Sequence, residues 1–342
     1  MYKKWLICLL PFLLTGCWDK KDPEDRAFII TLGADAAAEG CRFIFAPANM
    51  ETEEPYLAES KTLAGAVAQV DTRSSRKTDL GQLKTVILGK ELLQDSEKLD
   101  SFLAELERSQ AVSEKVMLLA ADSAAECVAK VMKEDSKTGL FLWDFYKNTA
   151  AEVAVTRGMD LDTFLTERTE QGGVLPQIRV EEDTLQLGGG MALSATGVSV
   201  WEEDEERGYL FLLGAAEGAV LEAEDRGEYL PLCITKTQAS YAFRQAGEAI
   251  FCEITLPVEG SLQGGISGKR KQMLEERYNE IIKKEVEHTI KIAQREQTDW
   301  FGVVPRLRRA MPRLAGSDTQ LWQRVAFRVS PAVKITDMGR KR

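Results

Sequence analysis

Residues 269–297 have the sequence KRKQMLEERYNEIIKKEVEHTIKIAQREQ and form the longest helical pattern in the chain. Apolar residues recur in it at intervals of three and four, so they fall on one stripe of an α-helix. Because such a stripe has to be buried, we expect a sheet to cover it. His288 lies off the stripe and is expected at the surface. The stripe consists of Leu274, Tyr278, Ile281, Ile282, Val286, Thr289, Ile290 and Ala293.

Segments with β-like composition lie on both sides of this helix. Turn residues separate the upstream runs at short intervals, which favours an antiparallel meander. The downstream run, 322–335, alternates around Val325, Phe327 and Val329, as a half-buried strand does. We therefore predict a C-terminal antiparallel sheet packed against the long helix. The upstream runs are 191–201, 208–213, 230–236, 240–244 and 249–258.

The part of the chain from residue 27 to residue 134 alternates between strand and helix patterns. Thr62 or Ser60 is a candidate N-cap for the first helix, and Asp122 is a candidate N-cap for the last. Strand, helix, strand and helix in this order predict at least one parallel crossover. The expected strands are 27–32, 42–45, 83–88 and 115–120, and the expected helices are 57–70, 97–108 and one that begins after Asp122.

A second unit begins near Asp135. It contains helix patterns at 140–147 and 160–168, followed by a strand at 175–180. Pro176 cannot donate a backbone hydrogen bond, so we expect an edge strand there. Gly188-Gly189-Gly190 is expected to form a turn between strands, because no helix follows to bind a phosphate at its N-terminus. The whole pattern predicts an α+β fold.

The amino end has the features of an export signal. Lys3 and Lys4 precede an apolar run, 5–14, which is too short to span a bilayer, since a spanning helix needs roughly 20 residues. The sequence Leu14-Thr15-Gly16-Cys17 then looks like a lipobox. We expect cleavage before Cys17, diacylglycerol on its thiol and a location on the extracytoplasmic face of the membrane. The alternative is an ordinary signal peptide with a chance cysteine.

The chain of 342 residues contains a single histidine, and this excludes many active sites. A Ser-His-Asp triad or a multi-histidine zinc site needs histidine beside its partners. Cys233 and Cys252 lie in β-like runs that could be neighbours, but we favour free thiols over disulfides. We therefore expect a binding protein with no catalytic residues, no metal and no cofactor. The cysteines expected in the mature chain besides Cys17 are Cys41, Cys127, Cys233 and Cys252.

Charge is distributed unevenly along the chain. The overall net charge is −10, but residues 269–342 carry a net charge of +9 and residues 18–268 a net charge of −21. An acidic run at 202–206 is expected at a solvated hairpin tip, although clustered carboxylates also occur in calcium and glycosidase sites. The basic end is expected to face anionic lipid, an acidic partner or simply solvent. It includes a cluster suited to binding phosphate or carboxylate groups, or to a surface loop: Arg306, Arg308, Arg309 and Arg313.

Several motifs in a fixed order resemble those of a known family. The first is Gly16-Cys17-Trp18-Asp19, which is followed by an apolar strand ending in Leu32-Gly33-Ala34-Asp35. Gly81-Gln82 precedes a strand at a place where the family usually has Gly-His. Asp299-Trp300-Phe301-Gly302, Trp322 and the last strand complete the pattern. Together these features resemble the Ger(x)C family of spore germination lipoproteins.

The resemblance implies a place in the nutrient germinant receptor at the spore inner membrane, where this C subunit accompanies membrane-embedded A and B subunits. It implies lipidation of Cys17, and it leaves open whether the subunit contacts a small-molecule germinant. The expected export of the chain argues against a nucleic-acid partner. A solute-binding lipoprotein of a transporter and a cell-wall hydrolase are the alternatives. The resemblance also implies three mixed α/β domains. The expected boundaries are a signal peptide at 1–16, a lipidated tether at 17–26 and domains at 27–134, 135–190 and 191–342.

Overall fold

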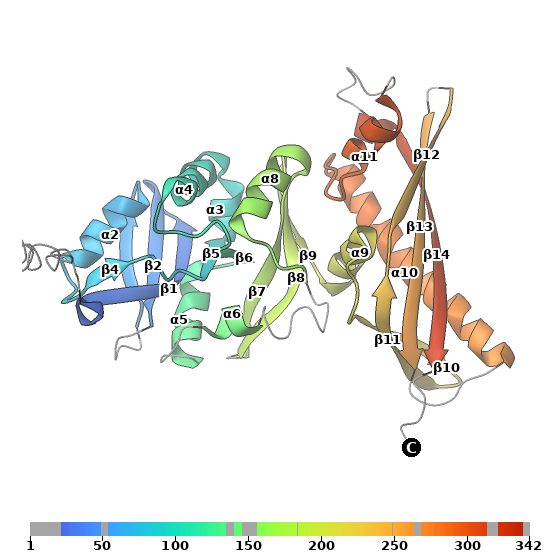
Figure 1. Ribbon diagram of the computed structural model, residues 1–342, viewed down its shortest axis with the longest axis horizontal. Helices are drawn as coiled ribbons and strands as arrows, with labels where there is room; N and C mark the ends of the chain where they lie inside the picture. The colour runs from blue at the N-terminus through green and yellow to red at the C-terminus, as the bar shows by residue number, and fades with distance from the viewer. Residues whose placement is uncertain are drawn as a thin grey trace, which may run out of the picture.

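The computed structural model describes residues 22–48, 54–134, 140–145, 156–182, 184–247, 249–262, 268–312 and 321–337. The chain forms two β-sheets, one after the other along the long axis of the molecule (Figure 1). Helices pack against both sheets, so the prediction of an α+β fold is confirmed.

The first sheet has the strand order β3-β2-β1-β5-β6-β7-β8-β9, with β4 beside β1. β1, β5 and β6 are parallel, which confirms the prediction of at least one parallel crossover. β7 joins β6 through the single pair Ala120–Gln177, whereas β7, β8 and β9 pair antiparallel with one another. The strands are β1 (Arg26–Ala36), β2 (Cys41–Pro47), β3 (Tyr56–Ser60), β4 (Lys77–Asp79), β5 (Thr85–Gly89), β6 (Met117–Ala121), β7 (Val174–Glu181), β8 (Thr184–Ser194) and β9 (Gly197–Trp201).

Helices cover both faces of the strands β1 to β6. Leu63 of α2 and Phe102 of α4 belong to a core on one face, together with Leu32 of β1. Val128 of α5 belongs to the core on the other face, with Ile87 of β5. The helices of this half are α2 (Leu63–Asp71), α3 (Lys90–Gln94), α4 (Ser96–Arg108), α5 (Ala124–Glu134), α6 (Phe141–Phe145) and α8 (Leu161–Gln171).

The second sheet is built around the long central strand β13. β11 and β12 pair with successive parts of one side of β13, and β10 pairs with β11. β14 lies on the other side and is parallel to β13, from the pair Ile250–Val325 to the pair Leu262–Asp337. The sheet is therefore antiparallel except for this last pair of strands. The strands are β10 (Val220–Asp225), β11 (Glu228–Thr237), β12 (Ser240–Ala246), β13 (Ala249–Leu262) and β14 (Val325–Asp337).

The predicted long helix is α10 (Gly268–Arg295), and it covers one face of this sheet. Leu274, Tyr278 and Ile282 are fully buried, which confirms that the apolar stripe faces the sheet. The Tyr278 hydroxyl donates a hydrogen bond to the carbonyl oxygen of Leu230 at 2.7 Å. His288 is exposed, as predicted, and lies 3.0 Å from Glu205. α11 (Val303–Ala310) follows, and short 3-10 turns are formed by Pro23–Asp25 and Leu321–Arg324.

The prediction of a strand at 208–213 is wrong, because these residues belong to helix α9 (Glu203–Leu213). Glu202 and Glu205 form a capping box, in which the Glu205 carboxylate accepts a hydrogen bond from the Glu202 N–H at 2.9 Å. Tyr209 to Leu212 are all buried, since α9 packs against both α10 and β8. A helix buried on all sides gives a short continuous apolar run, which periodicity cannot distinguish from a strand.

Three further predictions of local structure are corrected. Pro176 does not mark an edge, because β7 lies between β6 and β8, and an irregular register beside Pro176 accommodates the missing donor. Gly188-Gly189-Gly190 lies inside strand β8 and is not a turn. Thr62 is the N-cap of α2, but the segment before it, where we expected the helix to begin, is strand β3.

Candidate functional site

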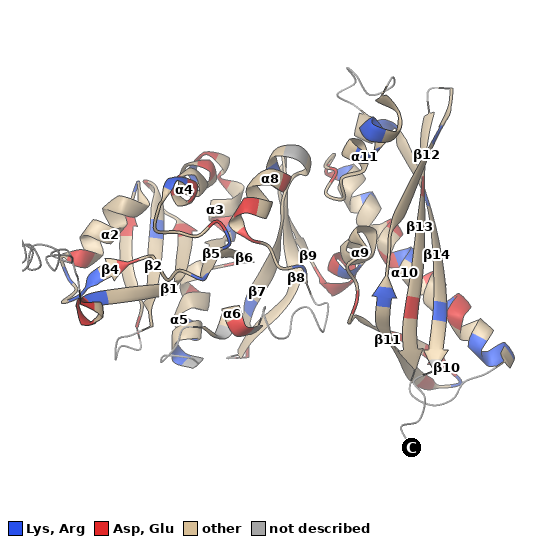
Figure 2. Cartoon of the chain, in the orientation of Figure 1, with Lys and Arg blue, Asp and Glu red and all other residues tan. Residues whose placement is uncertain are grey.

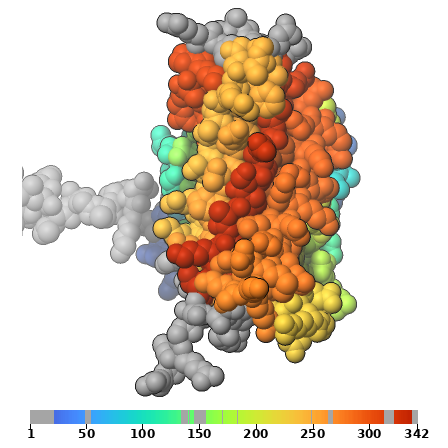
Figure 3. All heavy atoms as spheres, turned by 90° about the vertical axis from the view of Figure 1, so that its right-hand side faces the viewer, coloured from blue at the N-terminus to red at the C-terminus, as the bar shows by residue number. Residues whose placement is uncertain are grey.

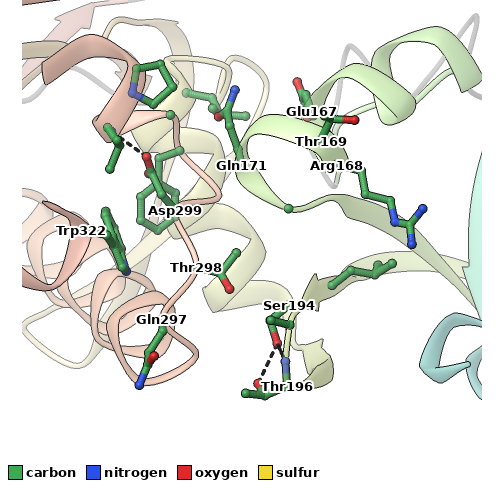
Figure 4. Close-up of a pocket in the computed structure, with 18 of the residues that line it drawn as sticks. Glu167, Arg168, Thr169, Gln171, Ser194, Thr196, Gln297, Thr298, Asp299 and Trp322 are labelled. Atoms are coloured by element: carbon green, nitrogen blue, oxygen red, sulfur yellow. Dashed lines mark hydrogen bonds between the residues drawn. The ribbon is translucent and has the colours of Figure 1, made fainter. Parts of the chain in front are cut away.

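A cleft of about 1490 Å³ lies between the two halves of the molecule. Its first wall is formed by the α3–α4 junction, by α8 and by the turn between β8 and β9. Its second wall is formed by the segment that follows α10, residues 297–302, by α11 and by Trp322. Figure 4 shows side chains of both walls, with Arg168 and Ser194 on one side and Thr298 and Trp322 on the other. We call this feature the interdomain cleft.

The motif Asp299-Trp300-Phe301-Gly302 forms much of the second wall. The Asp299 carboxylate caps α11 by accepting hydrogen bonds from the N–H groups of Val303 at 2.9 Å and Val304 at 2.6 Å. Burial raises the pKa of this carboxyl group, and the two backbone N–H groups oppose that effect. Asp299 therefore has a structural role that fixes the start of α11 at the edge of the cleft.

Gly302 allows the two walls to approach closely. Its φ angle is +68°, a left-handed conformation that favours glycine. A Cβ atom at this position would lie 2.6 Å from Oε1 of Gln171, which belongs to α8 in the first wall, and 2.9 Å from the Arg306 guanidinium. The backbone conformation therefore favours glycine at this point, where the two halves meet.

Aromatic side chains connect the halves beneath the cleft. The ring centroid of Trp201 lies 5.1 Å from that of Trp300 and 5.5 Å from that of Tyr209. Tyr209 and Trp322 in turn contact Phe301, with centroid distances of 6.3 Å and 6.1 Å. All five are buried, so the floor of the cleft is a continuous aromatic core that spans both halves.

The arginine cluster singled out in the sequence lies on α11, whose basic side is visible in Figure 2. Arg306, Arg308 and Arg309 line the interdomain cleft, whereas Arg313 lies outside the described residues. The Arg306 guanidinium donates to the carbonyl oxygens of Phe301 and Gly302 and stacks over the Tyr241 ring at 4.6 Å. The alternative of a surface loop is wrong, because these residues belong to a helix in the wall of the cleft.

The first wall contributes two more arginines, and both are paired. Arg157 forms an ion pair with Glu167 at 2.8 Å, and Arg168 is bonded to Asp100. Among the described residues, the lining of the cleft thus contains five arginines and two carboxylates, Glu167 and Asp299. The cleft is a basic site in an acidic chain.

The acidic run at 202–206 does not lie at a hairpin tip, because it forms the first turn of α9. Glu206 is completely buried against the first half, where its Oε1 accepts a hydrogen bond from the Thr156 hydroxyl at 3.0 Å. Its Oε2 has no hydrogen-bond partner among the described residues. Burial raises the pKa of Glu206 to about 8. The carboxyl group is therefore mostly protonated at neutral pH, and it is unsuited to hold a calcium ion.

The N-terminal motif Leu32-Gly33-Ala34-Asp35 also has a structural role. The Asp35 carboxylate accepts hydrogen bonds from the N–H groups of Ala124 at 2.8 Å and Ala125 at 2.9 Å, at the start of α5. The prediction that Asp122 caps this helix is wrong, since Asp122 is exposed and lies 3.8 Å from Lys90. Ser123 is the local cap, since its hydroxyl accepts a hydrogen bond from the Glu126 N–H at 3.3 Å. The contribution of Asp35 comes from 89 positions before Ala124, which local sequence patterns do not reveal.

The four cysteines of the described residues are free, as predicted. Cys233 is exposed, and the strand register places it opposite Ser261, whereas Cys252 is opposite Phe243. The described part of the chain contains no group of three side chains arranged to bind a metal ion. It also contains no helix long and apolar enough to cross a bilayer. The predicted signal peptide and Cys17 lie outside the described residues.

Two family models match the chain, one in each half. The model described as "Spore germination protein N-terminal domain" matches residues 19–180, and the model described as "Spore germination B3/GerAC like, C-terminal" matches residues 195–339. A search of curated proteins finds no match. The fold is similar to that in the crystal structure of the GerBC protein, with a TM-score of 0.58 and 14% identity over 89% of this chain and 96% of that one. The chain therefore belongs to the GerAC family of spore germination proteins, the family that its motifs resemble.

Proposed function

We propose that this protein is the lipid-anchored, non-enzymatic C subunit of a spore nutrient germinant receptor. In this proposal it is held at the extracytoplasmic face of the spore inner membrane by diacylglycerol on Cys17. It is required for germination triggered by nutrients, and it acts through a complex with membrane-embedded A and B subunits. The observation that carries the proposal is the match of both halves of the chain to spore germination models.

The position of the amino end supports an anchored arrangement. The first described residue, Asp22, follows Cys17 by five positions, and five residues span at most about 18 Å when fully extended. The beginning of β1 would therefore stay close to the bilayer. The second sheet lies at the other end of the long axis of the molecule (Figure 1). An anchored chain also gains effective concentration toward membrane partners, so that weak contacts suffice for assembly.

The chemistry of the interdomain cleft supports binding as the activity. The two carboxylates among its described lining residues are engaged, Glu167 with Arg157 and Asp299 with the first turn of α11. Hydroxyl, amide and guanidinium groups make up the remaining polar lining, including Thr298 and Gln171. Such groups are suited to recognising a ligand through hydrogen bonds and charge.

The test is genetic. The gene is deleted together with any paralogues, and dormant spores are exposed to nutrients while the loss of refractility is recorded. We expect no response to nutrients but normal germination with an agent that bypasses receptors. A normal nutrient response would contradict the proposal. A second experiment isolates the tagged protein from membranes, where the A and B subunits should be recovered with it.

A further inference from the structure

We infer that the interdomain cleft is a docking site for an acidic peptide segment of a protein partner. The inference deepens the proposed function, because it gives the chemistry by which a receptor partner would be recognised. It stands on three properties of the cleft: its free cationic groups, its size and its polar lining.

The free cationic groups are on α11. No ion pair or hydrogen bond engages the side chains of Arg308 and Arg309 within the described ranges, and both side chains are exposed. Neighbouring acidic residues are occupied elsewhere, since Asp299 caps α11 and Glu167 is paired with Arg157. Within the described part of the chain, the two arginines therefore present positive charge to the cleft that no carboxylate compensates.

Arg306 adds a guanidinium that is already fixed in place. Contacts with the carbonyl oxygen of Gly302 at 2.8 Å and with the ring of Tyr241 at 4.6 Å hold it. The Tyr241 hydroxyl is itself fixed, because it donates to the carbonyl oxygen of Leu212 at 2.6 Å. Those backbone contacts use one terminal nitrogen of Arg306, so the other edge of the guanidinium remains for a carboxylate, which it can bind bidentately. A preorganised group of this kind loses little conformational entropy on binding.

The size of the cleft favours a peptide over a small molecule. Pockets for small ligands usually measure about 300–1,000 Å³, whereas this cleft measures about 1490 Å³. A bilayer surface is too broad to enter a concave site between two sheets. The side chains of Gln171, Ser194 and Thr298 supply donors and acceptors that a peptide backbone requires when it leaves water.

The charge of the rest of the chain makes the site selective. The chain has a net charge of −10, so an acidic partner is repelled from most of it. Only a basic region such as the cleft can attract carboxylates over a distance, and this attraction weakens as ionic strength rises. An acidic segment is therefore repelled by the acidic part of the surface and attracted by the cleft, and this difference favours binding there.

The test measures binding of a fluorescent hexaglutamate peptide to the full-length protein purified in non-ionic detergent, by anisotropy at low and high ionic strength. We expect binding that weakens with salt, and no binding of hexaglutamine. The double variant R308E/R309E should weaken binding by about tenfold or more, because it replaces attraction with repulsion. Arg306→Lys keeps the charge but removes the planar guanidinium that binds a carboxylate bidentately, so it should weaken binding less than R308E/R309E does. The matched control is K284E/K291E on α10, which changes the net charge equally at exposed positions outside the cleft.

Several outcomes would overturn the inference. One is an absence of binding at low ionic strength, and another is an equal loss of affinity in R308E/R309E and in K284E/K291E, which would indicate unspecific attraction. Competition by free glutamate or inorganic phosphate as strong as that by the peptide would make the cleft a small-anion site instead. Unchanged melting midpoints establish that the variants are folded. Because the assay uses purified protein, its result is independent of whether spores lacking the gene respond to nutrients.

Discussion

The indole N–H of Trp300 donates a hydrogen bond to the carbonyl oxygen of Leu193 at 2.8 Å, and this contact joins the two halves of the molecule. Leu193 lies in β8 of the first sheet, whereas Trp300 follows α10 and leads into α11. Both residues are buried. The bond thus fixes the second wall of the interdomain cleft to the first at a point that water cannot reach.

We expect Trp300→Phe to lower the free energy of unfolding by about 1–3 kcal/mol, because it leaves a buried carbonyl oxygen without its donor. Urea denaturation followed by circular dichroism measures the change. The control is Trp143→Phe, since Trp143 is only half-buried and its ring contacts Lys84 at 5.8 Å. An equal effect of both substitutions would show that the Trp300 bond has no special role.

The packing of α10 gives a second prediction. The Ile282 side chain is completely buried, with 0% of its surface exposed to solvent. Ile282→Asp would therefore place an unpaired carboxylate against the second sheet. We expect a loss of several kcal/mol in the free energy of unfolding. Lys284→Asp, at an exposed position on the same helix, should leave the thermal midpoint almost unchanged. An unchanged midpoint in Ile282→Asp would contradict the burial of the stripe.

Local sequence patterns predicted the secondary structure correctly where only one face of an element is buried. The amphipathic stripe of α10 predicted its partner sheet, and Asp160 begins a helix at the expected place because it caps α8 through its own side chain. Patterns failed where burial is complete, as in α9, whose consecutive apolar residues have the composition of a strand. They also did not predict the hydrogen bonds of Asp35 to the start of α5, because Asp35 and α5 are far apart in the sequence.

The candidate site could be predicted only in part. The arginine cluster was visible in the sequence because three of its residues lie within four positions of α11. The cleft was not visible, since its walls come from segments as distant as Gln94 and Trp322, and only tertiary contacts bring them together. The motif at 299–302 pointed to the family, but its role as part of the cleft wall depends on contacts with β8 and α8.

The outer edge of β14 gives a third prediction. Among the described strands β14 pairs only with β13, and α10 lies along its other side (Figure 3). Side chains of α10 accept hydrogen bonds from this edge: Asn279 Oδ1 from the Val333 N–H at 2.8 Å, and Glu275 Oε1 from the Ile335 N–H at 2.9 Å. They protect an edge that could otherwise pair with another chain.

We therefore expect the double variant N279A/E275A to self-associate and to lose about 0.5–1.5 kcal/mol of stability for each hydrogen bond removed. Analytical ultracentrifugation measures the association, and urea denaturation measures the stability. The control is E276A/E280A, which removes two exposed carboxylates from the same helix. Association of the control to the same extent would attribute the effect to lost charge and not to the uncovered edge.

The lipid anchor gives a fourth prediction. Cys17→Ala should leave an uncleaved precursor that a palmitate analogue does not label, because the variant lacks the thiol that is alkylated. Membrane attachment should weaken, since a diacylglycerol anchor is durable whereas single acyl chains bind only marginally. Cys233→Ala is the control, because Cys233 is the exposed cysteine of the described residues. Labelling that persists in Cys17→Ala would contradict the prediction that Cys17 is the lipidated residue.

The final prediction concerns the buried carboxyl group of Glu206, which lies between α9 and the first half of the molecule. Its pKa is raised to about 8 by burial, whereas an unfolded chain has the ordinary value of 4.5. The folded state therefore binds more protons than the unfolded state between these two values, so the free energy of unfolding falls as pH rises through this window. Each pH unit in the window changes the contribution of Glu206 by about 1.4 kcal/mol.

Glu206→Gln removes the titrating group but keeps an oxygen that can accept the hydrogen bond from the Thr156 hydroxyl. In the wild type this hydroxyl lies 3.0 Å from Oε1 of Glu206. We expect the variant to become more stable than the wild type as pH rises from about 5 to 8, with the difference levelling off above pH 8. Urea denaturation at a series of pH values measures the difference in the free energy of unfolding between the variant and the wild type. Glu203→Gln, at an exposed position in the first turn of the same helix, should give the pH profile of the wild type. Parallel profiles for Glu206→Gln and the wild type would show that the pKa of this carboxyl group is the same in the folded and unfolded states, so that its titration does not couple pH to stability.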